Sequence, residues 1–82
     1  MRLHYFVKAN ADGFQVQESQ ESYGGEHDDP AEFEEGQVVT YPGLELARRA
    51  AVRCFNEATH QAAGSAWRVT LDVTSPVAAA RV

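Results

Sequence analysis

The distribution of charge constrains this chain more than any other feature of its sequence. No Lys or Arg occurs between Lys8 and Arg48, and the middle of that gap holds eight of the twelve carboxylates. Only Tyr23, Ala31 and Phe33 are apolar within the span of the eight, which are Glu18, Glu21, Glu26, Asp28, Asp29, Glu32, Glu34 and Glu35. Such a segment cannot bury enough apolar surface to form a core, so we expect its charges to face water or a cationic partner.

The size and composition of the chain bound its class. Its 82 residues predict a single domain over residues 1–82, and the net charge of −5 argues against direct nucleic-acid binding, which needs clustered Lys and Arg. The lone Cys54 excludes an internal disulfide and fits a reducing cytosol. No stretch resembles a signal peptide or approaches the ~20 apolar residues of a membrane span. We therefore expect a cytoplasmic protein, a monomer or weak dimer, that binds no membrane.

Two strands are predicted near the start of the chain. Apolar and polar side chains alternate over residues 3–7, apart from Phe6, and again over residues 14–17. Asp12-Gly13 between them is a strong reverse-turn signal, because Gly tolerates a positive φ. The pattern predicts a β-hairpin.

The acidic stretch, residues 18–36, is predicted to be a loop. Within it, residues 29–36 resemble a capped helix start, so one or two helical turns are expected there, with Phe33 pinning them to the body. Residues 37–41 have a β-rich composition and predict a short third strand.

The second half of the chain changes its period from two to about 3.6. Residues 44–63 predict an amphipathic helix whose inward stripe is Leu44, Ala47, Ala51, Phe55, Ala58 and Ala62. Residues 67–74 then alternate strictly and predict a central or nearly central strand, followed by a loose tail over residues 76–82. The sequence thus predicts an α+β fold of order β-β-β-α-β, a small antiparallel or mixed sheet of about four strands with the helix packed on one face.

No side-chain constellation in the sequence indicates catalysis. Residues 26–29 offer carboxylate and imidazole ligands, but their spacing matches no known metal loop, and a solvated or partner-facing acidic segment is the stronger interpretation. Cys54 and His60 are six residues apart on one helix and point away from each other. We therefore expect no enzyme activity, no cofactor and no metal, and a core position for the thiol.

Two further groups allow more than one interpretation. Arg48, Arg49 and Arg53 form the basic cluster of the predicted helix. They either make a salt-bridged exposed face, with Glu45 pairing to Arg49 and Arg53 to Glu57, or receive another surface such as the protein's own acidic stretch. The aromatic residues of that stretch are either anchors to the core or hot spots for a partner pocket.

The chain resembles the small phage-encoded anti-CRISPR proteins that inhibit type I surveillance complexes. The resemblance lies in the hairpin, the Ala-rich helix, the alternating last strand and the excess of acid, and in no sequence motif. It implies a cytoplasmic protein of the host bacterial cell, whose carboxylates occupy the basic surface of the complex in place of target DNA, as a DNA mimic. The partner-binding residues would be Glu18, Glu21, Tyr23, Glu26, Asp28, Asp29, Glu32, Phe33, Glu34 and Glu35.

A second resemblance implies a different partner. Tyr5-Phe6-Val7 followed by Asp12-Gly13-Phe14-Gln15-Val16 is similar to the first hairpin of HicB antitoxins, and a helix and a strand follow as in their partial ribonuclease H-like domain. The Pro-Gly-Cys and Gly-Asp-Thr signature of that family is absent, and Tyr41-Pro42-Gly43 matches it only in fragment. This resemblance implies binding to a small basic toxin.

Overall fold

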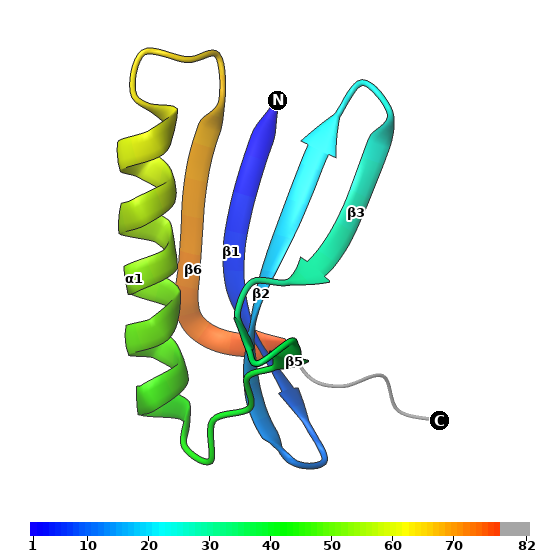
Figure 1. Ribbon diagram of the computed structural model, residues 1–82, viewed down its shortest axis with the longest axis vertical. Coiled ribbons are helices and arrows are strands. Elements are labelled where there is room, and N and C mark those ends of the chain that lie inside the picture. Colours follow the sequence, from blue (N-terminus) through cyan, green and yellow to red (C-terminus); the bar gives the residue numbers. More distant parts are fainter. Residues whose placement is uncertain (78–82) are drawn as a thin grey trace.

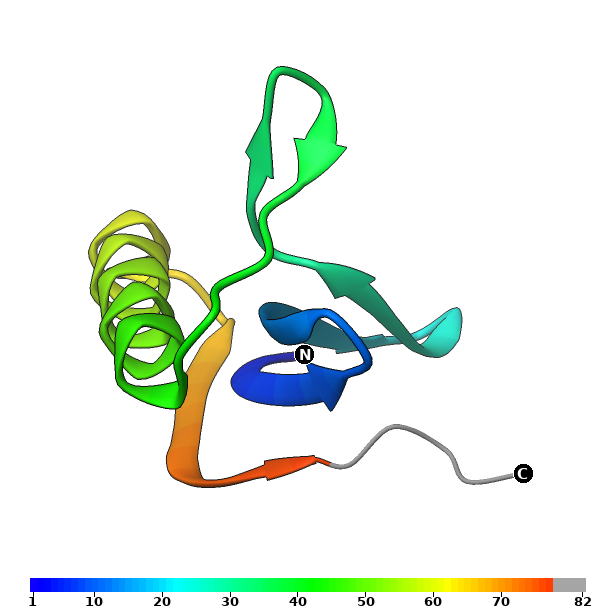
Figure 2. The same ribbon diagram turned by 90° about the horizontal axis from the view of Figure 1, so that it is seen from below.

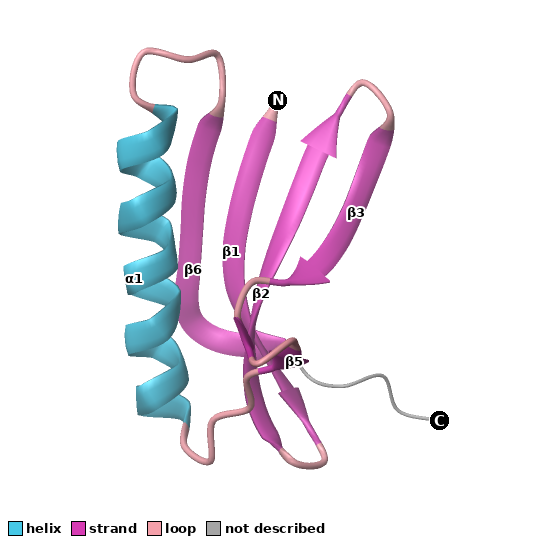
Figure 3. Ribbon diagram, viewed as in Figure 1, coloured by secondary structure: helices cyan, strands magenta, loops and turns pink. Residues whose placement is uncertain are grey.

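One mixed sheet and one helix make up the body of the protein. The structure is a computed structural model that describes residues 1–77. β1 (Arg2–Asn10), β2 (Gly13–Ser22), β3 (Gly25–Pro30) and β6 (Arg68–Val77) form a sheet of order β3-β2-β1-β6, which α1 (Leu44–Ala62) covers on one face (Figures 1 and 3). β1, β2 and β3 are antiparallel neighbours, whereas β6 is parallel to β1. The predicted α+β class, with about four strands and one packed helix, is confirmed.

A second, smaller sheet projects from the body. β4 (Phe33–Glu34) and β5 (Gln37–Val38) pair antiparallel, and the green hairpin that contains them stands away from the helix and the main sheet in Figure 2. The turn between them places Glu35 at φ 51° and Gly36 at φ 81°, the left-handed conformation that hairpin turns favour. The helical turn predicted over residues 29–36 is therefore wrong.

The strand predicted over residues 37–41 forms only in part. β5 ends at Val38, and Tyr41 instead makes an isolated antiparallel bridge with Phe14, whose amide donates to the Tyr41 carbonyl at 2.8 Å and whose carbonyl accepts from the Tyr41 amide at 2.7 Å. The close approach requires Gly13, because a Cβ there would lie 2.3 Å from the Tyr41 carbonyl oxygen. The segment that leads into the helix therefore packs against the residues that follow the predicted Asp-Gly turn.

The core lies between α1 and the three strands that the helix contacts, β1, β2 and β6. Its fully buried members include three alanines, which let the helix lie close to the sheet, and they are Tyr5, Val7, Val16, Ala47, Ala50 and Ala51. Phe55 of the helix and Val69, Leu71 and Val73 of β6 pack around them while partly buried. Of the predicted inward stripe, every residue except Ala62 belongs to this core, and Ala50 joins it. Gly64, at φ 80°, follows the helix end.

β6 differs from its prediction in position and in length. It occupies the edge of the sheet rather than the centre, because within residues 1–77 it pairs only with β1. The strand continues through Pro76 to Val77, which an edge position permits since Pro cannot donate to a second neighbour. Of the predicted loose tail, residues 78–82 lie outside the described part of the chain.

A bend interrupts β6 where it leaves its first register with β1. The Asp72 carboxylate accepts hydrogen bonds from the Thr74 amide at 3.0 Å and hydroxyl at 2.7 Å, which lowers the pKa of Asp72. Arg48 of α1 donates to the carbonyls of Val73 at 2.7 Å and Thr74 at 3.1 Å. Arg48 is therefore a structural link between helix and sheet, in addition to its place in the basic cluster predicted from the sequence.

Candidate protein-binding surface

The acidic stretch forms two hairpins instead of the predicted loop. The first acidic hairpin is the end of β2 with β3, residues 18–30, and the second is β4 with β5, residues 33–38. In Figure 2 the tip of the first extends to the right of the sheet and the second stands above it. Both therefore project away from the layer formed by α1.

β3 is exposed on both of its faces. The helix packs on β6, β2 and β1, and residues 25–29 are all exposed. Successive side chains of a strand point to opposite faces, so Glu26 and Asp28 share one face while His27 and Asp29 share the other. The four residues that the sequence offered as metal ligands are thus divided between two faces, and no group of three metal-ligating side chains occurs among residues 1–77.

The two aromatic residues of the acidic stretch are exposed. Tyr23, at the tip of the first acidic hairpin, is 99% exposed, and Phe33, in β4, is 59% exposed. The interpretation of these residues as anchors to the core is wrong. Hydration of an exposed aromatic ring is unfavourable in the free protein, and burial against a partner would relieve it. The second interpretation, contact with a partner, therefore remains the prediction for both.

Glu32 holds the base of the second acidic hairpin and faces inward. Its side chain is only 16% exposed and lies 2.6 Å from the Arg53 guanidinium. It also accepts hydrogen bonds from the Tyr41 hydroxyl and, at 3.6 Å, from the Cys54 thiol. Arg53 therefore pairs with the protein's own acidic stretch and not with Glu57, so the second interpretation of the basic cluster holds at this position.

Burial and the Glu32 carboxylate raise pKa values within this cluster. Burial first, and the hydrogen bond to Glu32 second, raise the pKa of Tyr41. Burial, followed by the charge of Glu32, raises the pKa of the Cys54 thiol to about 11. A thiol with so high a pKa is protonated at neutral pH and is a poor nucleophile, and it packs against the core as predicted.

Glu18 is also engaged inside the protein. The Tyr5 hydroxyl donates to its carboxylate at 2.6 Å, and burial together with this bond raises the pKa of Tyr5. Because Tyr5 is 5% exposed, the bond satisfies a buried hydroxyl that would otherwise lack a partner. Glu18 and Glu32, both predicted to bind a partner, therefore make structural contacts within the protein.

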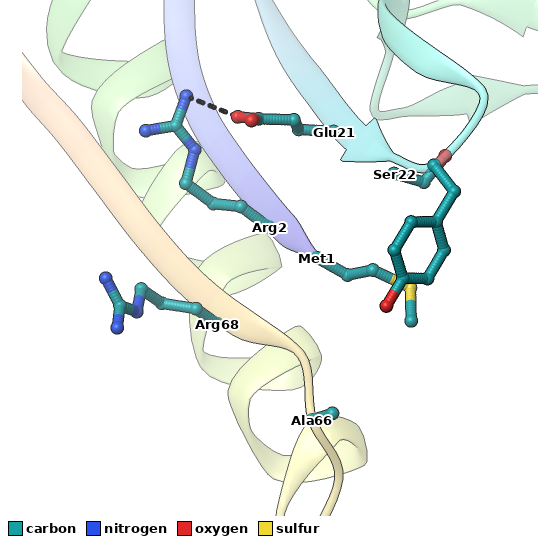
Figure 4. Close-up of a pocket in the computed structure, with 7 residues that line it drawn as sticks. Met1, Arg2, Glu21, Ser22, Ala66 and Arg68 are labelled. Atoms are coloured by element: carbon teal, nitrogen blue, oxygen red, sulfur yellow. Dashed lines mark ion pairs between the residues drawn. The ribbon is translucent and has the colours of Figure 1, made fainter.

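Glu21 lies at an open hollow beside the tip of the first acidic hairpin. The hollow has a volume of about 530 Å³ and is lined by Met1, Arg2, Glu21, Ser22, Tyr23, Ala66 and Arg68. Arg2 reaches across to Glu21 at 3.3 Å, and Arg68 extends from the neighbouring strand (Figure 4). This end of the sheet is of mixed charge, so the purely acidic area begins beyond Glu21.

The remaining residues define what we call the acidic surface. It consists of five exposed carboxylates with no Lys or Arg partner among residues 1–77, together with the two exposed aromatic residues. Its members are Tyr23, Glu26, Asp28, Asp29, Phe33, Glu34 and Glu35. All of them belong to the partner-binding residues predicted from the sequence. Glu18 and Glu32 differ from them because they contact residues that are distant in the chain.

No protein-family model, curated protein or solved structure matches this chain. Its function is therefore inferred from its own residues. Within residues 1–77, no helix combines the length and the apolar character that crossing a membrane requires.

Proposed function

We propose that this chain is a non-enzymatic inhibitor that binds a basic protein through its acidic surface. The observation that carries the proposal is that five of its carboxylates, Glu26, Asp28, Asp29, Glu34 and Glu35, are exposed on two projecting hairpins without a Lys or Arg partner among the described residues. Like charges that gather in this way repel one another in the free protein, and a basic surface relieves that repulsion.

The partner that we favour is the DNA-binding surface of a type I CRISPR surveillance complex in the cytoplasm of a bacterial cell. Such a surface must present Lys and Arg to the phosphates of its target, because phosphate contacts supply most of the affinity for DNA. Carboxylates held on a folded scaffold occupy the same positive potential and are steered to it over several ångströms. The inhibitor would act stoichiometrically, as a DNA mimic, by excluding DNA.

A second candidate is an antitoxin of the HicB type, and the sheet topology favours it. Three antiparallel strands are followed by a crossover helix and a last strand parallel to the first, which is the arrangement expected of a partial ribonuclease H-like domain. The partner would then be a small basic toxin. Both candidates use acidic side chains against a basic protein, and they differ in the identity of that protein.

A pulldown from host lysate at low and high salt tests the proposal. The wild type should recover a basic protein at low salt and lose it at high salt, because screening weakens charge contacts between exposed groups. Recovery of surveillance-complex subunits supports the first candidate, and recovery of one small basic protein supports the second. A partner that is acidic, or whose recovery is independent of salt, would contradict the proposal.

A further inference from the structure

β3 has an unpaired edge. It is the outermost strand of the main sheet, and among residues 1–77 only β2 pairs with it (Figure 1). The projecting β4 and β5 form their own sheet and do not continue this edge. An unpaired edge presents a row of backbone donors and acceptors that another strand can use.

The register with β2 identifies which backbone groups point outward. Val16 and Ala31 are hydrogen-bonded partners, since the Ala31 amide donates to the Val16 carbonyl at 2.9 Å. Hydrogen-bonded and non-bonded pairs alternate along an antiparallel ladder, so His27 and Asp29 also bond toward β2. The N–H and C=O groups of Glu26 and Asp28 therefore point outward, together with the carbonyl of Pro30, which has no N–H.

The side chains of β3 select the kind of strand that can pair there. Carboxylates stand on both faces, with Glu26 and Asp28 on one and Asp29 on the other. A second copy of the chain is disfavoured, because antiparallel pairing of two β3 edges sets carboxylates opposite carboxylates. A strand with Lys or Arg on both faces instead gains an opposite charge at each of these positions.

We infer that the β3 edge binds an extended, Lys- or Arg-rich segment of the partner by strand addition. Backbone bonds to Glu26 and Asp28 fix the register of the segment, and the carboxylates of β3 select its charge. Tyr23 lies just beyond the end of the edge, fully exposed, where its ring is available to a cationic side chain. The inference rests on the proposed function, since it assumes a basic protein partner, and it specifies how that partner is held.

The test uses the whole chain and, as probe, the seven-residue peptide Thr-Lys-Lys-Thr-Lys-Lys-Thr with blocked ends, which places Lys on both faces of an extended strand. Amide hydrogen exchange is followed by NMR with and without the peptide. The amides of Glu26 and Asp28 should be protected by at least about tenfold when the peptide is bound, whereas those of His27 and Asp29 are already protected in the free protein. The same peptide with Glu in place of every Lys is the control and should protect neither amide.

Two substitutions at one position separate backbone pairing from charge. Asp28→Asn removes the carboxylate and keeps the outward N–H, whereas Asp28→Pro removes both without breaking a bond to β2. The Pro variant should bind the Lys peptide at least about fivefold more weakly than the Asn variant, and protection of Glu26 should be lost. The wild-type exchange measurement does not depend on how well either variant folds.

Three results would overturn the inference. They are binding of the Lys peptide without new protection at Glu26 and Asp28, failure of the peptide to bind at millimolar concentration, and concentration-dependent protection of these amides in the free chain, which would assign the edge to a second copy. The first would leave the salt-dependent pulldown unaffected, because contact through charge alone does not require strand addition. Strand addition and the proposed function can therefore fail separately.

Discussion

The Arg53 guanidinium lies 2.6 Å from the Glu32 carboxylate, and this ion pair joins the helix to the base of the second acidic hairpin. The two residues are 21 positions apart, so the contact depends on the tertiary fold. Because the Glu32 side chain is mostly buried while the Arg53 side chain is largely exposed, loss of the ion pair is more costly for the carboxylate, which water cannot easily solvate.

The Glu32 contact predicts different costs for two neighbouring substitutions. Glu32→Gln should lower the free energy of unfolding by about 1–2 kcal/mol, because it weakens a charge-assisted bond to Arg53 in a mostly buried site. Glu34→Gln, the matched exposed control, should change it by less than about 0.5 kcal/mol. Denaturant titration of both variants measures the difference, and equal effects would show that the Glu32 cluster does not stabilise the fold.

The bond between Tyr5 and Glu18 predicts a second stability effect. Tyr5→Phe keeps the buried ring but removes the hydroxyl that donates to Glu18 at 2.6 Å, so we expect a loss of about 1–2 kcal/mol. A double-mutant cycle with Glu18→Gln should give a coupling energy near 1 kcal/mol. Additive effects of the two substitutions would mean that the bond is absent in solution.

Gly13 predicts a conformational cost. It has φ 144°, and a Cβ would lie 2.3 Å from the Tyr41 carbonyl oxygen, so Gly13→Ala should destabilise the protein by about 2–3 kcal/mol. Gly64→Ala is the control, because Gly64 also has a positive φ but no atom lies near its added Cβ, and it should cost about 1 kcal/mol. Thermal unfolding compares the two, and a Gly13 variant as stable as the Gly64 variant would contradict the close approach.

The raised pKa of Cys54 predicts a loss of stability in alkali. The folded protein holds the thiol proton more tightly than the unfolded chain does, so the stabilisation is complete below the ordinary pKa of 9.0 and is lost as the pH rises toward about 11. Tyr5, whose pKa is also raised, adds to the loss at the upper end of this range. Unfolding free energies measured from pH 8 to 11 should therefore fall less steeply in Cys54→Ala than in the wild type, and parallel curves would contradict the raised thiol pKa.

The elements with a clear hydrophobic period could be predicted from the sequence. Alternation and the Asp12-Gly13 turn indicate the first hairpin, a 3.6-residue stripe indicates α1, and strict alternation over residues 67–74 indicates β6. Each of these patterns reflects burial on one face, which the local sequence records. The position of β6 at the sheet edge could not be predicted from its alternation, because an edge strand can be buried on one face in the same way as a central strand.

β3 and the structural carboxylates could not be predicted in this way. The sequence Gly-Glu-His-Asp-Asp-Pro has no β-branched residue and no apolar face, so it forms a strand because β2 offers it a hydrogen-bonded neighbour. Glu32 and Glu18 differ from the exposed carboxylates only through Arg53, Tyr41 and Tyr5, which lie far from them in the chain or on another strand. Sequence identifies the acidic surface as a group, and tertiary contacts decide which members are free.

The measurement that tests the central claim most directly compares two variants of equal charge for binding to the partner recovered in the pulldown. One carries Asp28→Asn, Asp29→Asn and Glu34→Gln within the acidic surface, and the other carries Asp12→Asn, Glu45→Gln and Glu57→Gln elsewhere; each changes the net charge from −5 to −2. The first should lose at least about tenfold in affinity, mainly through slower association, and should depend less on salt, whereas the second should stay within about twofold of the wild type. Equal losses in both variants, or full binding by the first, would contradict the assignment of partner binding to the acidic surface.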